Sequence, residues 1–425
     1  MLLFWELLAT AGSAGFAALL VRRWLWESGL SPVRGGVALP EHRGERPDGG
    51  ALLRVFCAAL AFRLCWAVVS LLVYRLLTGD GVGLGELPAL WSRWDAPHYI
   101  HLAELGYGGY LEEGKPLFLV FFPLYVWLVR GVTMLVGDTA LAGMGVSWLC
   151  FGWGSVYVYR LAAEEYGRSA AGRSLALLWS FPFSFFFGGI MTESLFLLTT
   201  AAGLYHIRRH QWGRAAIWGV LAAMTRMQGV LLVGAAGAEL FCQEKPFART
   251  GKERGRTLLR MAGKLPLLAA PVLGSGGYFL LNYRVAGDPF AFVEMQKHWS
   301  QGFQWFPEVL AYLAKNAFTW PNVSTRWEMW IPELALFPLF AFLLWRSREK
   351  HRSMFTLYAF VYFILNYCLS WLLSAGRYLA CALPFFWFGA VELEGRPGLT
   401  RWLTAGMGLL QIVFCFRYLC WGQVM

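Results

Sequence analysis

The chain has 425 residues, of which 57% are hydrophobic and 15% are charged, whereas a soluble domain has about 45–50% apolar and about 25% charged residues. Its 22 tryptophans fit a membrane protein, because tryptophan is enriched where helices meet the lipid headgroups. Spans of about 20 residues each would use most of this length. The composition therefore excludes a soluble enzyme and leaves no room for a sizeable soluble domain.

The net charge of +11 does not indicate nucleic-acid binding. The basic residues lie in short segments between apolar runs, seven of them between Lys245 and Lys264. This distribution is typical of the positive-inside pattern of membrane proteins, and the segments carry no nucleic-acid-binding motif. The eight cysteines include no CxxC pair, so neither a zinc site nor a disulfide framework is indicated. We expect membrane lipids, and no nucleic acid, among the partners.

The first 50 residues form an apolar segment followed by an Arg/Gly/Pro-rich linker. Residues 1–21 are apolar and end at Arg22-Arg23, whereas a secretory signal carries its positive charge before the apolar stretch. We therefore expect a first span with its N-terminus outside, then a flexible cytoplasmic linker over 22–50. Residues 51–425 are expected to form one transmembrane catalytic domain.

The remaining apolar runs predict an all-α, polytopic protein with about 11–13 transmembrane helices. If successive runs cross the membrane alternately, the basic loops lie inside and the two long polar loops, 78–116 and 284–330, lie outside. The predicted runs are 52–77, 117–136, 139–160, 174–189, 191–207, 214–241, 265–283, 331–345, 353–373, 377–391 and 402–421.

Two regions do not fit simple alternation. The runs 117–136 and 139–160 must together make one net crossing, so one of them is expected to be short, tilted or re-entrant. The run 214–241 has basic residues on both flanks and Thr225-Arg226 in its middle. It is predicted to be two half-helices that rise to the outer face and return. Such irregular backbone is tolerated only where it lines a protein cavity.

Ionisable residues inside apolar runs are functional candidates, because a charge at mid-bilayer costs about 2.5–3.5 kcal/mol on insertion scales. Glu193, Arg226 and Arg377 are predicted at the outer ends of apolar helices, so one acid and two bases from distant sequence should meet at one membrane face. Arg63 is instead expected to extend to the inner headgroups.

The same face carries the loop around Asp95. From Pro97 onward its apolar and polar residues alternate with helical period, which predicts an amphipathic helix lying on the bilayer. Asp95 precedes this helix, and an ordinary N-cap is one interpretation of it. A metal site formed by Asp95, His98 and His101 is a second, less favoured one. The tryptophans of the loop 284–330 are interpreted first as interfacial anchors and second as acceptor-binding residues.

Several short motifs, in order and at similar spacing, resemble the GPI mannosyltransferase 2 family, the α-1,6-mannosyltransferases of GPI-anchor synthesis, and its prokaryotic relatives. The resemblance runs from about Phe56 to Phe388. Its motifs are Trp94-Asp95 with His98-Tyr99, Ala103-Glu104-Leu105-Gly106-Tyr107, Phe121-Phe122-Pro123-Leu124-Tyr125, Thr192-Glu193-Ser194-Leu195-Phe196, Thr225-Arg226-Met227-Gln228-Gly229-Val230-Leu231, and Arg377-Tyr378 with Pro384.

The resemblance implies a GT-C fold whose first external loop carries an acidic catalytic residue, and a polyprenyl-phosphate sugar donor, with mannose the expected sugar. Asp95 is then the best-placed general base, and Arg226 and Arg377 can bind the donor phosphate. Glu193 either orients an arginine or binds acceptor hydroxyls. Because the donor is a monophosphate, no metal ion and no cofactor are expected.

His98, Tyr99 and Tyr378 belong to the same motifs and are predicted to bind or orient substrate. The predicted function is an inverting membrane mannosyltransferase with an extracytoplasmic acceptor, such as a glycolipid, in the cell membrane of a bacterium or the endoplasmic reticulum of a eukaryote. The chief alternative is a polytopic transporter or flippase, which should show repeat symmetry and midplane charges. A non-catalytic scaffold has no need for four charged residues on one face. The oligomeric state is left open.

Overall fold

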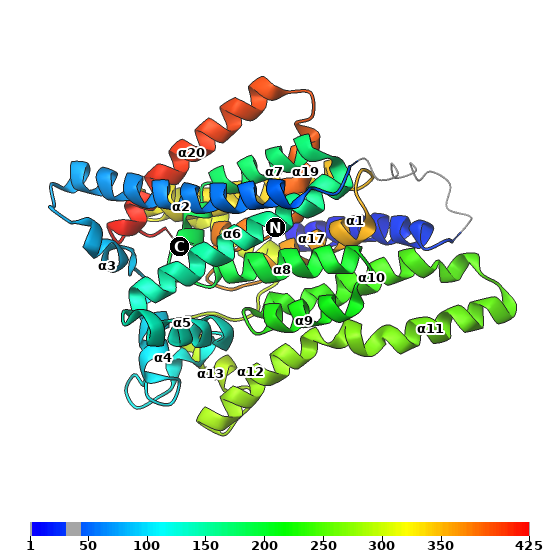
Figure 1. Ribbon diagram of the computed structural model, residues 1–425, viewed down its shortest axis with the longest axis horizontal. Coiled ribbons are helices and arrows are strands. Elements are labelled where there is room, and N and C mark those ends of the chain that lie inside the picture. The colour runs from blue at the N-terminus through cyan, green and yellow to red at the C-terminus, as the bar shows by residue number, and fades with distance from the viewer. Residues whose placement is uncertain (1, 31–43, 425) are drawn as a thin grey trace.

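The computed structural model describes residues 2–30 and 44–424, and within these residues the chain forms helices and no strand (Figure 1). The α-helices are α1 (Leu2–Glu27), α2 (Gly49–Thr78), α3 (Leu87–Trp91), α4 (Ala96–Leu105), α5 (Pro123–Val136), α6 (Thr139–Tyr166), α7 (Arg168–Ser180), α8 (Glu193–Arg208), α9 (Trp212–Ala223), α10 (Leu232–Glu244), α11 (Gly251–Ala269), α12 (Pro271–Ala286), α13 (Ala291–His298), α14 (Phe306–Thr319), α15 (Val323–Thr325), α16 (Ile331–Ser347), α17 (Ser353–Asn366), α18 (Ala375–Ala380), α19 (Pro384–Glu392) and α20 (Pro397–Leu419).

Shorter helical turns connect several of these elements. Five are 3₁₀ turns and the last is a π-helical turn: η1 (Leu84–Glu86), η2 (Leu117–Val120), η3 (Ser184–Gly188), η4 (Met227–Leu231), η5 (Pro246–Ala248) and η6 (Arg326–Trp330). The all-α prediction is confirmed.

Among the described residues, six helical segments are long and apolar enough to cross a membrane: Phe4–Glu27, Gly49–Thr78, Thr139–Tyr166, Gly251–Ala286, Val323–Ser347 and Pro397–Leu419. The protein is an integral, multi-pass membrane protein. The sequence predicted about 11–13 transmembrane helices, and several of the remaining apolar runs form shorter helices. Some of these shorter helices pack inside the bundle. Helix α8, for example, is almost entirely buried and packs against α6, α9 and α10.

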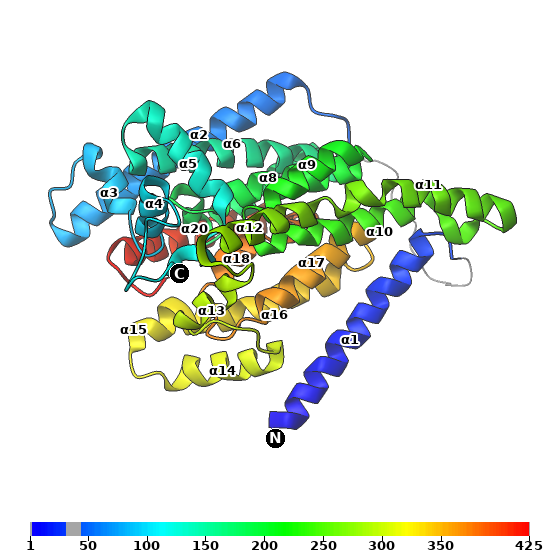
Figure 2. The same ribbon diagram turned by 90° about the horizontal axis from the view of Figure 1, so that it is seen from below.

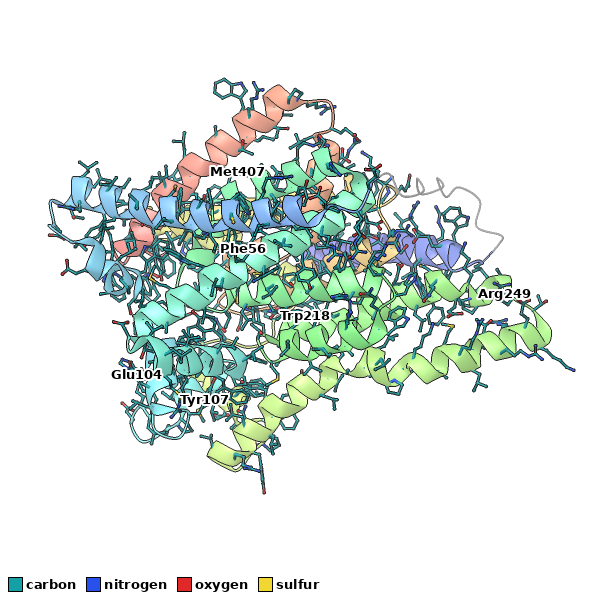
Figure 3. All side chains as sticks on the ribbon, viewed as in Figure 1. Phe56, Glu104, Tyr107, Trp218, Arg249 and Met407 are labelled. Atoms are coloured by element: carbon teal, nitrogen blue, oxygen red, sulfur yellow. The ribbon has the colours of Figure 1, made fainter. Side chains whose placement is uncertain are left out.

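The expected external and cytoplasmic segments lie at opposite ends of the long axis. Helices α3, α4 and α13 gather at one end, and the beginning of α11 projects from the other (Figure 1). The labelled side chains agree, because Glu104 and Tyr107 lie at the first end and Arg249 at the second (Figure 3). The bundle thus separates the polar loop 78–116 from the basic segment 242–264, as alternate crossing predicts.

The two regions that did not fit alternate membrane crossing, residues 117–160 and 214–241, are irregular in the structure. Helix α5 has 14 residues, which gives a length of about 21 Å and is too short to cross a hydrocarbon core of about 30 Å. Helix α6, with 28 residues, makes the crossing. The run 214–241 divides into α9 and α10, joined by η4. The prediction of two half-helices is confirmed.

The N-terminal segment differs from the expectation. Helix α1 does not end at the arginine pair but continues to Glu27, where Arg23 Nε lies 3.0 Å from Glu27 Oε1. This pairing within one helical turn lets the helix carry its charges without ending. Figure 2 shows α1 at one edge of the bundle. Part of the predicted linker, residues 31–43, lies outside the described residues.

Arg63 also differs from the expectation. Its side chain does not extend to the headgroups but is 1% exposed, and its Nη1 donates to the carbonyl oxygen of Ser184 at 2.9 Å. The guanidinium lies 3.9 Å from the ring centroid of Phe151, so an aromatic face and a carbonyl of η3 replace water around the charge. Arg63 therefore binds η3 and is buried away from lipid.

The orientation in the membrane can be tested by labelling single cysteines in a cysteine-free background. Cysteine at Gly108 or Gly302, both exposed and with room for a side chain, should react with a membrane-impermeant maleimide applied to intact cells. Cysteine at Thr250, which is exposed at the opposite end of the bundle, should react only after permeabilisation. Labelling of Thr250→Cys in intact cells would contradict the orientation derived from the basic loops.

Candidate active site

Four charged side chains from distant parts of the chain form one ion network. Asp95 immediately precedes α4, and Glu193 is the first residue of α8. Arg226 lies in the turn between α9 and η4, and Arg377 lies in the short helix α18. We call these four residues the ion network. The structure thus brings together the acid and two bases that were predicted to converge, together with the carboxylate of the first external loop.

One carboxylate oxygen is shared by both arginines. Glu193 Oε1 accepts hydrogen bonds from Arg226 Nη2 and from Arg377 Nε. Arg377 Nη1 also donates to Asp95 Oδ2 at 2.6 Å, and Arg226 Nε donates to Thr192 Oγ1 at 2.8 Å. Arg377 therefore links the two carboxylates, because its fork of donors can serve two acceptors at once.

The members of the ion network differ in exposure. The side chain of Glu193 is 0% exposed and that of Arg377 is 4% exposed, whereas the side chain of Asp95 is 26% exposed. Within the described residues, two buried atoms of the network have no hydrogen-bond partner, Glu193 Oε2 and Arg226 Nη1. The network therefore has an accessible side at Asp95 and an unused donor at Arg226.

Asp95 occupies the N-cap position of α4 but does not act as the predicted cap. Its backbone is helical, and its side chain makes no capping hydrogen bond. The carboxylate instead accepts from Arg377, 282 residues away. A charged guanidinium is a stronger partner for a carboxylate than a neutral amide is, so the tertiary contact replaces the local one. The interpretation of Asp95 as an ordinary N-cap is therefore wrong.

The break between α9 and η4 is what places Arg226 in the network. Arg226 has an extended backbone, with φ −156° and ψ 152°, which ends the first half-helix and turns its side chain toward Thr192 and Glu193. The chain then passes so close to α9 that a Cβ on Gly229 would lie 2.2 Å from the carbonyl carbon of Ala222. Only glycine allows this return, so Gly229 fixes the geometry beside Arg226.

The three predicted substrate-orienting aromatic residues lie in different surroundings. The ring of Tyr378 lies against Arg226, with 5.1 Å between its centroid and the guanidinium carbon. Tyr99 is 5% exposed, and its ring packs edge-on against Phe121 and Tyr125. Tyr378 is thus in contact with the network, whereas Tyr99, on α4, packs against residues at and just before the start of α5.

His98 faces the aromatic residues of the loop. Its ring stacks on Phe118 at 4.5 Å, its Nδ1 lies 3.0 Å from the hydroxyl of Tyr110, and burial lowers the pKa of its imidazole. His101 Nδ1 lies 3.7 Å from Glu104. In the part of the chain that the structure describes, no three His, Cys, Asp or Glu side chains are grouped as metal ligands.

The backbone just before Asp95 is strained and is held by the C-terminal segment. Trp94 has a positive φ of 55°, a conformation that costs a non-glycine residue about 1–2 kcal/mol. Its ring lies edge-on to Trp421 at 5.7 Å. Arg93 Nε donates to the carbonyl of Leu419 at 2.9 Å, and the hydroxyl of Tyr418 donates to the carbonyl of Arg93 at 3.1 Å. These contacts fix the position of Asp95.

The sequence analysis did not single out one buried acid close to the network. Glu333, on α16, is 1% exposed and accepts hydrogen bonds from the backbone that leads into Arg377. A signal was present, because Glu333 is an ionisable residue near the start of the apolar run 331–345, and such residues are candidates by default. Its partner is the backbone amide of Ala375, and no sequence motif predicts such a contact.

Comparison with known proteins gives one family match. Residues 115–269 match the family described as dolichyl-phosphate-mannose-protein mannosyltransferase. This stretch includes Glu193 and Arg226, whereas Asp95 and Arg377 lie outside it. No curated protein matches the chain.

Two solved structures are similar to the chain over most of its length. The first is the archaeal oligosaccharyltransferase AglB from Archaeoglobus fulgidus, in complex with an inhibitory peptide and a dolichol-phosphate, with 13% identity, a TM-score of 0.41, and coverage of 87% of this chain and 55% of that one. The second is the arabinosyltransferase EmbB from Mycobacterium smegmatis, with 16% identity, a TM-score of 0.39, and coverage of 98% and 44%. The chain thus spans about half the length of the structures it matches.

Glu193 should be the member of the network on which stability depends most. Glu193→Gln leaves two buried arginines without their shared carboxylate, and breaking a buried pair in this way costs about 3–5 kcal/mol. Asp95→Asn alters a partly exposed pair and should cost no more than about 1 kcal/mol. We therefore expect a much larger fall in Tm for Glu193→Gln in purified protein.

The matched control is Glu104→Gln, because Glu104 is an exposed acid of the same external region. Its Tm should stay at the wild-type value. An equal loss of stability in Asp95→Asn and Glu193→Gln would contradict the unequal burial of the two carboxylates.

Proposed function

We propose that the protein is a membrane glycosyltransferase with a GT-C fold, which moves mannose from a polyprenyl-phosphate donor to an acceptor at the extracytoplasmic face. The observation that carries this proposal is the ion network, in which a partly exposed aspartate and two buried arginines share one site. Transfer of a sugar from a lipid phosphate needs these groups, a base for the acceptor and fixed cations for the leaving phosphate.

Asp95 is the better candidate for the general base. The acceptor hydroxyl has to reach the base, and the side chain of Asp95 is 26% exposed whereas that of Glu193 is 0% exposed. Glu193 also holds both arginines through one oxygen. In this proposal Asp95 takes the proton and Glu193 orients the two arginines, which is one of the two roles that the sequence left open for Glu193.

The charges of the network suit an inverting displacement. The acceptor oxygen attacks C1 of the sugar and its proton passes to Asp95, while the bond from C1 to the phosphate oxygen breaks and the lipid phosphate leaves with the electron pair. Two arginines and two carboxylates sum to zero before the step. Protonation of Asp95 leaves a net charge of +1, just as the phosphate gains one negative charge. Arg377, released from part of its pairing, can then stabilise the leaving group.

The donor phosphate would approach Arg226 and Arg377 from the side of Asp95. Arg226 Nη1 is a buried donor with no hydrogen-bond partner among the described residues, and the burial of an unpaired donor is costly unless a ligand satisfies it. Tyr378, whose ring covers the Arg226 guanidinium, would shield the pair from solvent. A phosphate, like a carboxylate, matches the planar fork of donors of a guanidinium.

Similarity to the dolichyl-phosphate-mannose-protein mannosyltransferase family over residues 115–269 supports both a lipid-phosphate donor and mannose. The motifs that resemble those of the GPI mannosyltransferase 2 family support a lipid-linked acceptor. The direct test is incubation of the purified protein with radiolabelled polyprenyl-phosphate mannose and total membrane lipids. A labelled lipid product would support the transferase, whereas movement of the donor across vesicles without any product would support the flippase instead.

Asp95→Asn should abolish most of the transfer while the protein stays folded. The amide is isosteric with the carboxylate but cannot take a proton, and the loss of a general base costs roughly 10²–10⁴-fold in rate. The rate of product formation should be compared with that of Glu104→Gln as control. Retention of more than about a tenth of the wild-type rate would contradict the assignment of Asp95 as the base.

Replacing either arginine should weaken use of the donor. Arg226→Lys and Arg377→Lys should each recover only part of the activity that the alanine variants lose, because a point charge replaces a planar fork of donors. The measurement is kcat/KM for the donor at fixed acceptor. Full activity in Arg377→Ala would contradict its role. EDTA should leave transfer unchanged, because the two arginines, and not a divalent cation, are assigned to the phosphate.

A further inference from the structure

We infer that Glu333 is a positioning residue that holds α18, and with it Arg377, in place against Asp95 and Glu193. Its part in the reaction rests on the proposed function, whereas the contact itself does not. Glu333 Oε2 accepts from the backbone amide of Ala375 at 2.6 Å, and Oε1 lies 3.5 Å from the amide nitrogen of Gly376. Arg377 follows directly after these two residues.

The need for such a contact follows from how α18 begins. The first amides of a helix have no partner within the helix, and at Ala375 and Gly376, which are buried, water cannot replace one. Ser374, at the N-cap position, makes no side-chain hydrogen bond to them. The acceptor comes instead from α16, far away in the sequence. A local cap would satisfy the amides equally well, but only a cap from another helix fixes where α18 lies in the bundle.

Glu333 is itself held firmly and is not engaged elsewhere. The hydroxyl of Tyr367 donates to its carbonyl oxygen at 2.8 Å, which fixes the backbone. No cation pairs with its carboxylate within the described residues, so the amides of α18 are its main partners. A buried acid without a cation is a costly way to cap six residues of helix, which argues for a role beyond local stability.

Helix α18 has further close contacts. A Cβ on Gly376 would lie 2.4 Å from an atom of the Phe183 ring, so the backbone lies directly on this aromatic side chain. The hydroxyl of Tyr362 donates to the carbonyl of Tyr378 at 3.0 Å. Helix α18 is thus in close contact with Phe183 and Tyr362 as well as with Glu333. Because misplacement of a functional group by about 1 Å can cost 10²-fold in rate, loss of the Glu333 contact should reach the reaction through Arg377.

The first experiment measures the contact without reference to activity. Hydrogen–deuterium exchange of the purified protein should be faster in Glu333→Gln and Glu333→Ala than in wild type, with the change confined to the peptide around Ala375 and Gly376. Glu239→Gln is the matched control. Glu239 is equally buried, but at the opposite end of the bundle, where it pairs with Arg208 and His210. Unchanged exchange at α18 in both Glu333 variants would overturn the inference.

The second experiment separates positioning from a merely structural role. Glu333→Gln should lower kcat by about tenfold or more in the wild-type background. In the Arg377→Lys background, where the fork of donors is already lost, the same change should have an effect at least about fivefold smaller. Glu239→Gln should have the same effect in both backgrounds. Equal effects of Glu333→Gln in the two backgrounds would mean that Glu333 is only a cap, which would overturn the inference.

Failure of the proposed function would be visible separately. If the wild-type protein transfers no sugar from polyprenyl-phosphate mannose, the transferase proposal fails while the exchange experiment still decides whether Glu333 holds α18. The double-mutant cycle is then measured in Tm. Coupling between Glu333→Gln and Arg377→Lys, and none between Glu239→Gln and Arg377→Lys, would support positioning. Additive shifts would overturn it.

Discussion

The arrangement of the site depends on one carboxylate oxygen, Glu193 Oε1, which two buried arginines share. Each guanidinium would be expensive to bury alone, and the carboxylate between them makes their close approach possible. Three separate regions of chain therefore have to meet at this atom. The start of α8, the break between α9 and η4, and the short helix α18 are all placed by it, and Asp95 joins through Arg377.

The helix breaks follow from the same requirement. An uninterrupted helix over 212–244 would carry Arg226 in its middle, with no acid beside it. The break at Arg226 instead brings the guanidinium to Thr192 and Glu193, and the core around it shields the irregular backbone from lipid. The unpaired amides of α18 find an acceptor in Glu333 in the same way. Shorter internal helices, surrounded by longer spans, are the architecture that allows these breaks.

Sequence reasoning located the charged residues because charge in an apolar run is costly, and it located the break near Arg226 because both flanks of the run are basic. It could not assign partners. An ordinary N-cap remained one interpretation of Asp95 beside the general base, since its actual partner, Arg377, is 282 residues away. Arg63 was expected at the headgroups, because the aromatic face that covers it cannot be known before the helices are packed. The role of Glu333 was missed because its partners, the first amides of α18, are also brought close only when the helices pack.

The position of the proposed base, Asp95, depends on contacts with a distant part of the chain. Trp94 adopts a left-handed backbone conformation, and such strain persists only where the surroundings enforce it. The surroundings here are the end of α20 and the residues after it, which hold Arg93 and the ring of Trp94. Asp95 is thus fixed from its N-terminal side by the last segment of the chain and from its carboxylate by Arg377. The position of the base relative to the arginines is therefore set by packing across the whole bundle rather than by the loop that carries it.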